Sequence, residues 1–76
     1  MSRLPILSGK ELVKILCKKF GFVENRFNGD HLILKGTIKG VAKTIPVPLH
    51  PEIGRKLFSR ILKEAEITRD EFEKAL

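Results

Sequence analysis

The sequence predicts an α+β fold in the order helix, three antiparallel strands, helix and short terminal helix. Two segments, before residue 20 and after residue 54, carry apolar side chains at helical spacing. Between them lie short extended runs separated by glycine-containing steps. The 76 residues are enough for one small domain with a modest core. We therefore expect residues 1–76 to form a single domain.

The first helix is predicted to begin directly after Ser8. Ser8 and Glu11 have the spacing of a capping box, in which each side chain accepts a hydrogen bond from the other residue's backbone amide. Gly21 can take the left-handed conformation that ends many helices. The predicted inner face is formed by residues at helical spacing: Leu12, Ile15, Leu16 and Lys19.

Residues 22–27 and 31–35 are predicted to form a hairpin. These two short extended runs meet at the Asn28-Gly29 step, and Asn-Gly tolerates the positive φ values of tight turns. His31 opens the second strand just past this turn. The sheet would hold its backbone there while the ring stays near solvent, which makes His31 the leading candidate for chemistry.

A glycine-rich turn at residues 36–40 and a third strand at residues 41–48 are predicted next. Pro46 and Pro48 have no amide hydrogen to donate to a sheet ladder. We therefore expect this third strand to lie at an edge of the sheet.

The second helix is predicted over about residues 54–65. Its apolar face consists of Leu57, Phe58, Ile61, Leu62 and Ala65. Thr68 and Glu71 form a second capping box, which starts a short helix at the end of the sequence. Phe72 and Leu76 of that helix can fold back on the core.

A three-stranded antiparallel meander with two helices on one face is the arrangement of double-stranded-RNA-binding domains. Those domains contact duplex RNA through the first helix, a loop between strands and the start of the second helix. The stripe of Lys10, Lys14 and Lys18 and the pair Arg55-Lys56 occupy corresponding places in the order of elements. A shared fold does not by itself establish a shared function.

The composition limits the class of protein. Cys17 is the only cysteine, so an internal disulfide and a four-cysteine zinc site are both excluded. No apolar run approaches the roughly 18 residues of a membrane span. The first seven residues are too short and too interrupted by proline for a signal peptide. We therefore expect a cytoplasmic protein that does not enter a membrane.

The charge is distributed unevenly along the chain. Residues 1–63 carry thirteen Lys or Arg against four acids, whereas residues 64–76 carry two against five. A basic body of this kind suits a polyanion, since bound cations release counterions from phosphates. A merely solvated basic surface is the alternative. The residues predicted to contact RNA are Lys10, Lys14, Lys18, Arg26, Gly29, Lys35, Arg55 and Lys56.

Five stretches of the chain lie in an informative order and spacing. They are Ser8-Gly9-Lys10-Glu11-Leu12, Phe20-Gly21-Phe22, Gly29-Asp30-His31, Val47-Pro48-Leu49-His50 and the segment 60–72, RILKEAEITRDEF. Each is weak alone, but together they resemble the HicA toxins, also called YcfA-like proteins. These are small messenger-RNA-cleaving components of toxin–antitoxin pairs.

The resemblance implies a double-stranded-RNA-binding fold, RNA cleavage without an obligatory metal and no cofactor. It also implies a catalytic histidine in a Gly-x-His motif, which matches Gly29 and His31, and a HicB-like antitoxin that covers this histidine. One position departs from the family pattern: Asp30 stands where a small hydroxyl residue is usual. A carboxylate there would repel the scissile phosphate or raise the pKa of His31.

Histidine suits metal-free RNA cleavage because its unperturbed pKa, about 6.5, allows it to act as base or acid near neutrality. His31 can fill one of these two roles at a time, so a slow enzyme is expected. The alternative is a structural role, in which His31 lies at the end of the strand and forms a hydrogen bond with the hairpin turn. His50 could be the second histidine of an acid–base pair or could fix its loop. No ligand spacing supports a metal site of His31, His50 and Asp30.

Three functions stay open on the sequence. The first is a toxin-type endoribonuclease with His31 as general acid or base, monomeric when free and neutralised by a HicB-like partner. The second is an RNA-binding module that has lost cleavage through Asp30. The third is an interaction protein whose ligand is an acidic protein. Phe27 could stack on a base or could pack in the core or in the hairpin.

Overall fold

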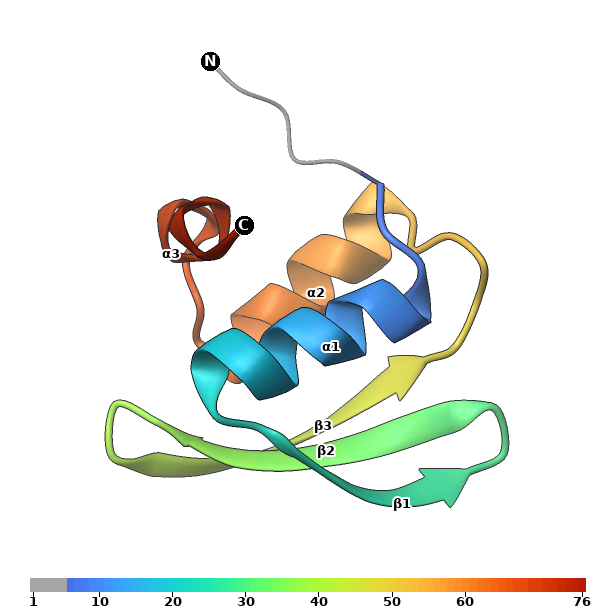
Figure 1. The fold of residues 1–76 in the computed structure, drawn as a ribbon, viewed down its shortest axis with the longest axis horizontal. Helices are drawn as coiled ribbons and strands as arrows, with labels where there is room; N and C mark the ends of the chain where they lie inside the picture. Colours follow the sequence, from blue (N-terminus) through green and yellow to red (C-terminus); the bar gives the residue numbers. More distant parts are fainter. Residues whose placement is uncertain (1–5) are drawn as a thin grey trace.

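The computed structural model describes residues 6–76 and has the predicted α+β architecture (Figure 1). The elements are α1 (Gly9–Phe20), β1 (Val23–Asn28), β2 (His31–Ile38), β3 (Val41–Pro48), α2 (Arg55–Ala65) and α3 (Arg69–Ala75). The three strands form one antiparallel sheet in the order β1-β2-β3, so β3 lies at an edge as its prolines predict.

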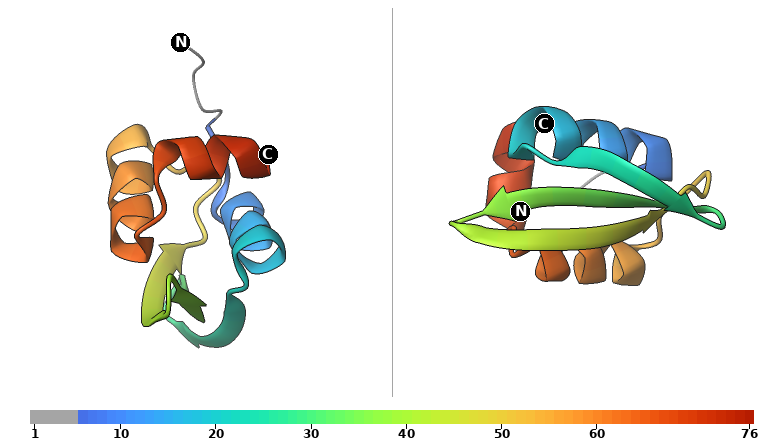
Figure 2. Two further views of the ribbon diagram at one scale, coloured as in Figure 1. Left: turned by 90° about the vertical axis from the view of Figure 1, so that its left-hand side faces the viewer. Right: turned by 90° about the horizontal axis from the view of Figure 1, so that it is seen from below.

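Both long helices cover the same face of the sheet, with α1 over the β1 side and α2 over the β3 side (Figure 2). Alternate residues of β2 and β3 point into this layer, because successive side chains of a strand face opposite ways. Leu32, Leu34, Ile45 and Val47 are therefore buried under the helices. Within residues 6–76, no helix covers the other face of the sheet (Figure 2).

The first helix is capped at both ends as predicted. The Glu11 amide donates to Ser8 Oγ at 3.1 Å, the Ser8 amide donates to Glu11 Oε1 at 2.9 Å, and Gly21 has φ +77°. The inner face differs from the prediction at one position: Lys19 is exposed, and Val13 is buried beside Leu12 and Leu16 instead. A lysine at the end of a helix can keep its ammonium group in water, whereas Val13 is apolar and is favoured in the interior.

The turn between β1 and β2 lies one residue later than predicted. The strands end at Asn28 and resume at His31, so Gly29 and Asp30 form the two-residue loop. Gly29 has φ +66°, and glycine at the first loop position is the preference of a type II′ hairpin turn. A β-bulge lies between Glu24 and Arg26. It allows both Glu24 and Phe27 to face the helix side of the sheet, although they are three positions apart and strict alternation would place them on opposite faces.

The second strand is longer than predicted, because residues 36–38 belong to β2 and only Lys39 and Gly40 form the next turn. Gly36 lies inside the strand where the ring of Phe22 packs against its backbone. A Cβ at Gly36 would lie 2.8 Å from that ring. The glycine therefore marks a close approach between chain segments and not a turn.

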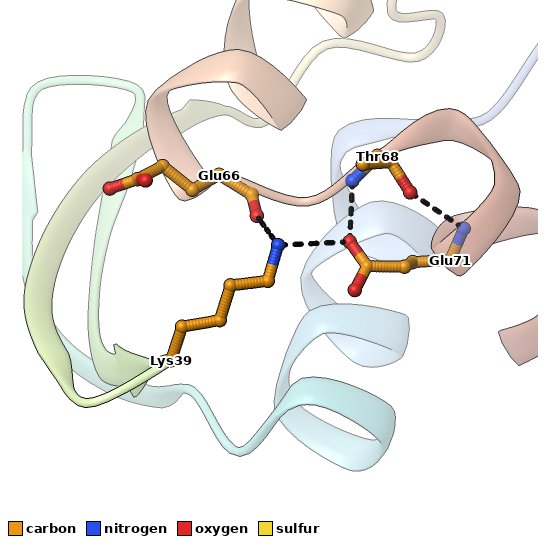
Figure 3. A network of polar contacts seen from close by, with 4 residues as sticks. All are labelled: Lys39, Glu66, Thr68 and Glu71. Atoms are coloured by element: carbon orange, nitrogen blue, oxygen red, sulfur yellow. Dashed lines mark hydrogen bonds and ion pairs between the residues drawn. The ribbon is translucent and has the colours of Figure 1, made fainter.

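The third helix is held against the rest of the fold by aromatic and polar contacts. The ring of Phe72 stacks with Phe20 of α1 and meets Phe58 of α2 edge-on, with centroids 6.1 and 5.1 Å apart. Lys39 Nζ, on the β2–β3 turn, donates to the Glu66 carbonyl oxygen at 3.3 Å and lies 3.5 Å from Glu71 Oε1 (Figure 3). These contacts tie α3 to the end of the sheet that is remote from His31 (Figure 1).

Candidate functional site

Three segments meet at the end of the molecule where β2 begins: the β1–β2 turn, the loop after β3 and the start of α1 (Figure 1). Backbone hydrogen bonds join them. The Leu49 amide donates to the Asp30 carbonyl and the Gly9 amide donates to the His50 carbonyl, both at 2.9 Å. The backbones on either side of His31 and His50 are thus fixed relative to each other.

Gly9 allows the start of α1 to approach this loop closely. A Cβ at Gly9 would lie 2.1 Å from the Pro48 carbonyl oxygen and 2.7 Å from Leu49 Cα. Both neighbours are backbone atoms, which cannot turn aside as a flexible side chain can. This close contact fixes the position of His50 in the loop after β3, because the His50 carbonyl accepts a hydrogen bond from the Gly9 amide.

The carboxylate of Asp30 lies between the two histidines. His31 Nδ1 is 3.1 Å from Asp30 Oδ1, and His50 Nε2 is 3.5 Å from Asp30 Oδ2. Both distances are ion-pair contacts between a ring nitrogen and a carboxylate oxygen. The exposed fractions of the side chains are 44% for His31, 49% for His50 and 69% for Asp30. We call this group the His–Asp–His cluster.

The surroundings favour an ionised Asp30. A hydrogen bond from its own backbone amide lowers the pKa of the Asp30 carboxyl from its ordinary value, and both nearby histidines lower it further. An ionised carboxylate accepts hydrogen bonds and cannot donate them. An N–H at the contacting ring nitrogen suits such an acceptor, and the other nitrogen of each ring is then left for proton transfer.

The cluster supplies two exposed imidazoles held by one carboxylate, which suits acid–base chemistry. A general base must be neutral and a general acid must be protonated, and two rings can divide these roles. Among residues 6–76, no group of three or more His, Cys, Asp or Glu side chains is arranged to hold a metal ion.

A comparison with protein families identifies the chain. Residues 9–67 match the model of the HicA toxin of bacterial toxin–antitoxin systems. The chain belongs to the HicA toxin family. Searches of curated proteins and of solved structures gave no match.

The HicA match runs from the first residue of α1 to the segment just after α2. It includes the His–Asp–His cluster and every basic residue predicted to contact RNA, whereas α3 lies beyond it. In the part of this HicA chain that the structure describes, no helix has the length and apolar character needed to cross a membrane.

The predicted lysines of α1 lie together. Lys10, Lys14 and Lys18 are exposed, and all three line a groove between α1 and the β1–β2 hairpin. Within residues 6–76 none of them makes an ion pair. Their ammonium groups are therefore available to an anionic ligand.

The other predicted RNA contacts lie on different surfaces. Lys35 and Arg26 fall on the helix-free face of the sheet, the face to which alternation also assigns His31. Arg55 lines a small pocket of about 240 Å³ between α2 and α3, and Lys56 is exposed beside it. Gly29 has open space around its Cα. The structure thus brings together the α1 lysines but does not join them to Arg55.

Two features of the site are not apparent from the sequence. The sequence suggests for Asp30 only an effect on phosphate or on His31, whereas Asp30 also meets His50, twenty positions along the chain. The pairing of β2 with β3 brings them close, since His31 lies opposite Pro48. Phe27 is 63% exposed and lies outside the core, because the bulge carries it to the rim of the α1 groove.

Proposed function

We propose that this HicA-family chain is a toxin that cleaves RNA, and that His31 is its principal catalytic residue. The observation that supports this most strongly is the His–Asp–His cluster, with 3.1 and 3.5 Å from the two rings to one carboxylate. The cluster lies in a strongly basic protein, with a net charge of +6. Phosphate binding and proton transfer are the two requirements for cutting RNA by its own 2′-hydroxyl.

In the proposed reaction one imidazole accepts the proton of a ribose 2′-hydroxyl. The 2′-oxygen then attacks the adjacent phosphorus, and the bond from phosphorus to the 5′-oxygen breaks. The second imidazole gives its proton to that 5′-oxygen. The products are a 2′,3′-cyclic phosphate and a free 5′-hydroxyl, and acid–base help of this kind accelerates reactions by about 10²–10⁴-fold.

Asp30 is the positioning residue in this account. Its two carboxylate oxygens engage the two rings separately, so that each ring is held in one tautomer and one orientation. His50 is the second proton-transfer group, a role that the sequence alone left open beside loop fixing. The lysines and arginines predicted to contact RNA bind its phosphates, and their contribution weakens as salt rises.

The partner in this proposal is a HicB-like antitoxin that covers His31. An acidic surface on that protein would complement the thirteen basic residues of segment 1–63. Binding over the His–Asp–His cluster would exclude RNA from both imidazoles. The toxin would act on messenger RNA once it is released.

The test compares the wild-type chain with His31→Ala on one structured messenger RNA in the presence of a chelator. We expect the variant to lose cleavage by about 10²–10⁴-fold, while thermal melting and RNA affinity stay close to wild type. Wild-type cleavage in chelator supports a metal-independent mechanism. Undiminished cleavage by His31→Ala would remove His31 from the active site.

A non-catalytic RNA-binding module is the second candidate, because the three α1 lysines carry no ion pair among the described residues. It predicts salt-sensitive RNA binding without turnover in either protein. A third outcome, binding of an acidic protein with no affinity for RNA, would contradict both candidates.

A further inference from the structure

A hollow lies along α1, and its lining does not include the residues of the His–Asp–His cluster. It has a volume of about 550 Å³ and opens between α1 and the β1–β2 hairpin. Its apolar lining consists of Val13, Cys17, Leu32 and Leu49, with Phe27 at the rim. Burial raises the pKa of the Cys17 thiol, which keeps this lining uncharged at neutral pH.

The two walls of the groove differ in chemistry. The α1 wall carries Lys10, Lys14 and Lys18 at intervals of one helical turn, so their ammonium groups form a row. The hairpin wall carries Phe27, with its ring exposed to solvent, and Glu24, whose carboxylate is a hydrogen-bond acceptor. One wall thus suits a line of phosphates, and the other offers a ring face and an acceptor.

The groove reaches the same end of the sheet as the cluster, since Leu49 of its lining precedes His50 and Phe27 lies opposite Leu32, the residue after His31. Alternation places the Leu32 side chain on the groove side of the sheet and His31 on the other face. A strand of RNA bound at both places would therefore pass over this end of the sheet.

We propose that the groove is a binding site for an unpaired nucleobase of single-stranded RNA, with Phe27 stacking on the base and the α1 lysines binding the adjoining phosphates. An aromatic ring beside a row of cations is the combination that binds single strands without requiring a particular sequence. A duplex would not fill the groove in this way, because its bases are already stacked on one another. The site would make the enzyme prefer loops and unpaired segments, a role that rests on the proposed RNA cleavage.

The test measures RNA affinity in the His31→Ala background, so that no substrate is cut. The probes are an unstructured RNA oligonucleotide, the same oligonucleotide with abasic sites, and a duplex of equal length. Phe27→Ala should weaken binding of the single strand by about 5- to 150-fold and leave the duplex unchanged. Phe27→Trp should retain the affinity, and the abasic RNA should bind equally well with and without the Phe27→Ala substitution.

Val41→Ala is the matched control, since Val41 is an exposed apolar residue, 51% exposed, at the start of β3 and outside the groove. It should leave all three affinities unchanged. Replacing Lys14 by Gln should reduce the salt dependence of single-strand binding by about one phosphate contact, and Lys74→Gln should not. Equal effects of Phe27→Ala and Val41→Ala, or equal loss on single strand and duplex, would overturn the proposal.

The measurements distinguish failure of the base-binding site from failure of the proposed RNA cleavage. If wild type cuts RNA and Phe27→Ala has no effect on single-strand affinity, the base site is refuted while cleavage stands. If wild type and Phe27→Ala both fail to cut RNA, but RNA binding depends on Phe27 and on the bases, the base site stands without cleavage. If Phe27→Ala leaves RNA affinity unchanged and weakens only the complex with an antitoxin, the groove is a protein-docking surface and the base site is refuted.

Discussion

Asp30 has one role when it is judged from the sequence and another when it is judged from the structure. From the sequence, a carboxylate beside the scissile phosphate threatens catalysis by repulsion. In the structure its oxygens are shared between His31 and His50 at 3.1 and 3.5 Å. The negative charge thus faces two imidazoles, which fits the positioning role that we propose for Asp30.

We expect Asp30→Asn to slow cleavage by more than about tenfold, because an amide cannot accept from both rings. The pH–rate profile should change as well, since the two histidines lose their common partner. Asp30→Ser, which restores the small hydroxyl that the family resemblance implies, should also slow the reaction. A faster reaction in Asp30→Ser would instead support repulsion of the phosphate and contradict the positioning role.

The elements show which local features can be predicted from sequence. Both capping boxes form as expected, because each involves residues only three positions apart. The hairpin and the edge position of β3 follow from glycine and proline in the same way. The β-bulge and the strand position of Gly36 do not, since both depend on what packs against the strand.

The junction between α1 and the loop after β3 is the element contact that matters most for the site. Gly9→Ala should lower the free energy of unfolding by about 1–3 kcal/mol, because the new Cβ meets backbone atoms of Pro48 and Leu49. It should also reduce cleavage, since the helix start would move away from His50. Gly54→Ala is the control, as a Cβ there has no neighbour within 4 Å. Chemical denaturation measures the free energy of unfolding of both variants. A smaller loss in Gly9→Ala than in Gly54→Ala would show that the start of α1 does not pack tightly on the loop after β3.

At the scale of the whole molecule, the acidic end of the sequence lies away from the His–Asp–His cluster. Glu66 and Glu71 pair with Lys43 and Lys39 near the β2–β3 turn, at the opposite end of the sheet from His31 (Figure 1). These pairs neutralise two basic residues that are remote from the site. The α1 lysines keep their charge, so the uneven distribution along the sequence becomes an uneven distribution in space.

The same carboxylates predict how stability depends on pH. Hydrogen bonds from the Ser8 amide, Lys43 and the Thr68 amide lower the pKa values of Glu11, Glu66 and Glu71 respectively. A carboxyl whose pKa is lower in the folded state stabilises the fold above its unfolded pKa and loses this contribution as pH falls. The melting temperature should therefore fall as pH drops below about 4.3, the ordinary pKa of glutamate.

Glu71→Gln should flatten this acid-side decrease, because glutamine keeps the capping hydrogen bond but does not titrate. Glu64→Gln is the control, since the Glu64 side chain is exposed and makes no ion pair or hydrogen bond within residues 6–76. Thermal melts from pH 7 to pH 3 measure the difference. Identical pH dependence in wild type and Glu71→Gln would contradict the role given to this carboxylate.

The order of elements and the caps could be predicted from the sequence because they rest on local patterns, whereas the candidacy of His31 rests on its place after the turn together with the resemblance to HicA toxins. The cluster could not, since Asp30 and His50 meet only after β2 pairs with β3 and α1 closes on the loop. The groove depends on the β-bulge between Glu24 and Arg26, which no residue type in the sequence indicates. Separation along the chain, and not the kind of residue, decided what could be predicted.

The most direct test of the central claim is a cleavage assay on an RNA that carries a single 2′-deoxy nucleotide at a site mapped with wild-type protein. If the His–Asp–His cluster acts through the 2′-hydroxyl, cleavage stops at that site alone, and the unmodified RNA yields ends bearing 2′,3′-cyclic phosphate and 5′-hydroxyl. Continued cleavage at the 2′-deoxy position, or products with a 5′-phosphate, would contradict the account.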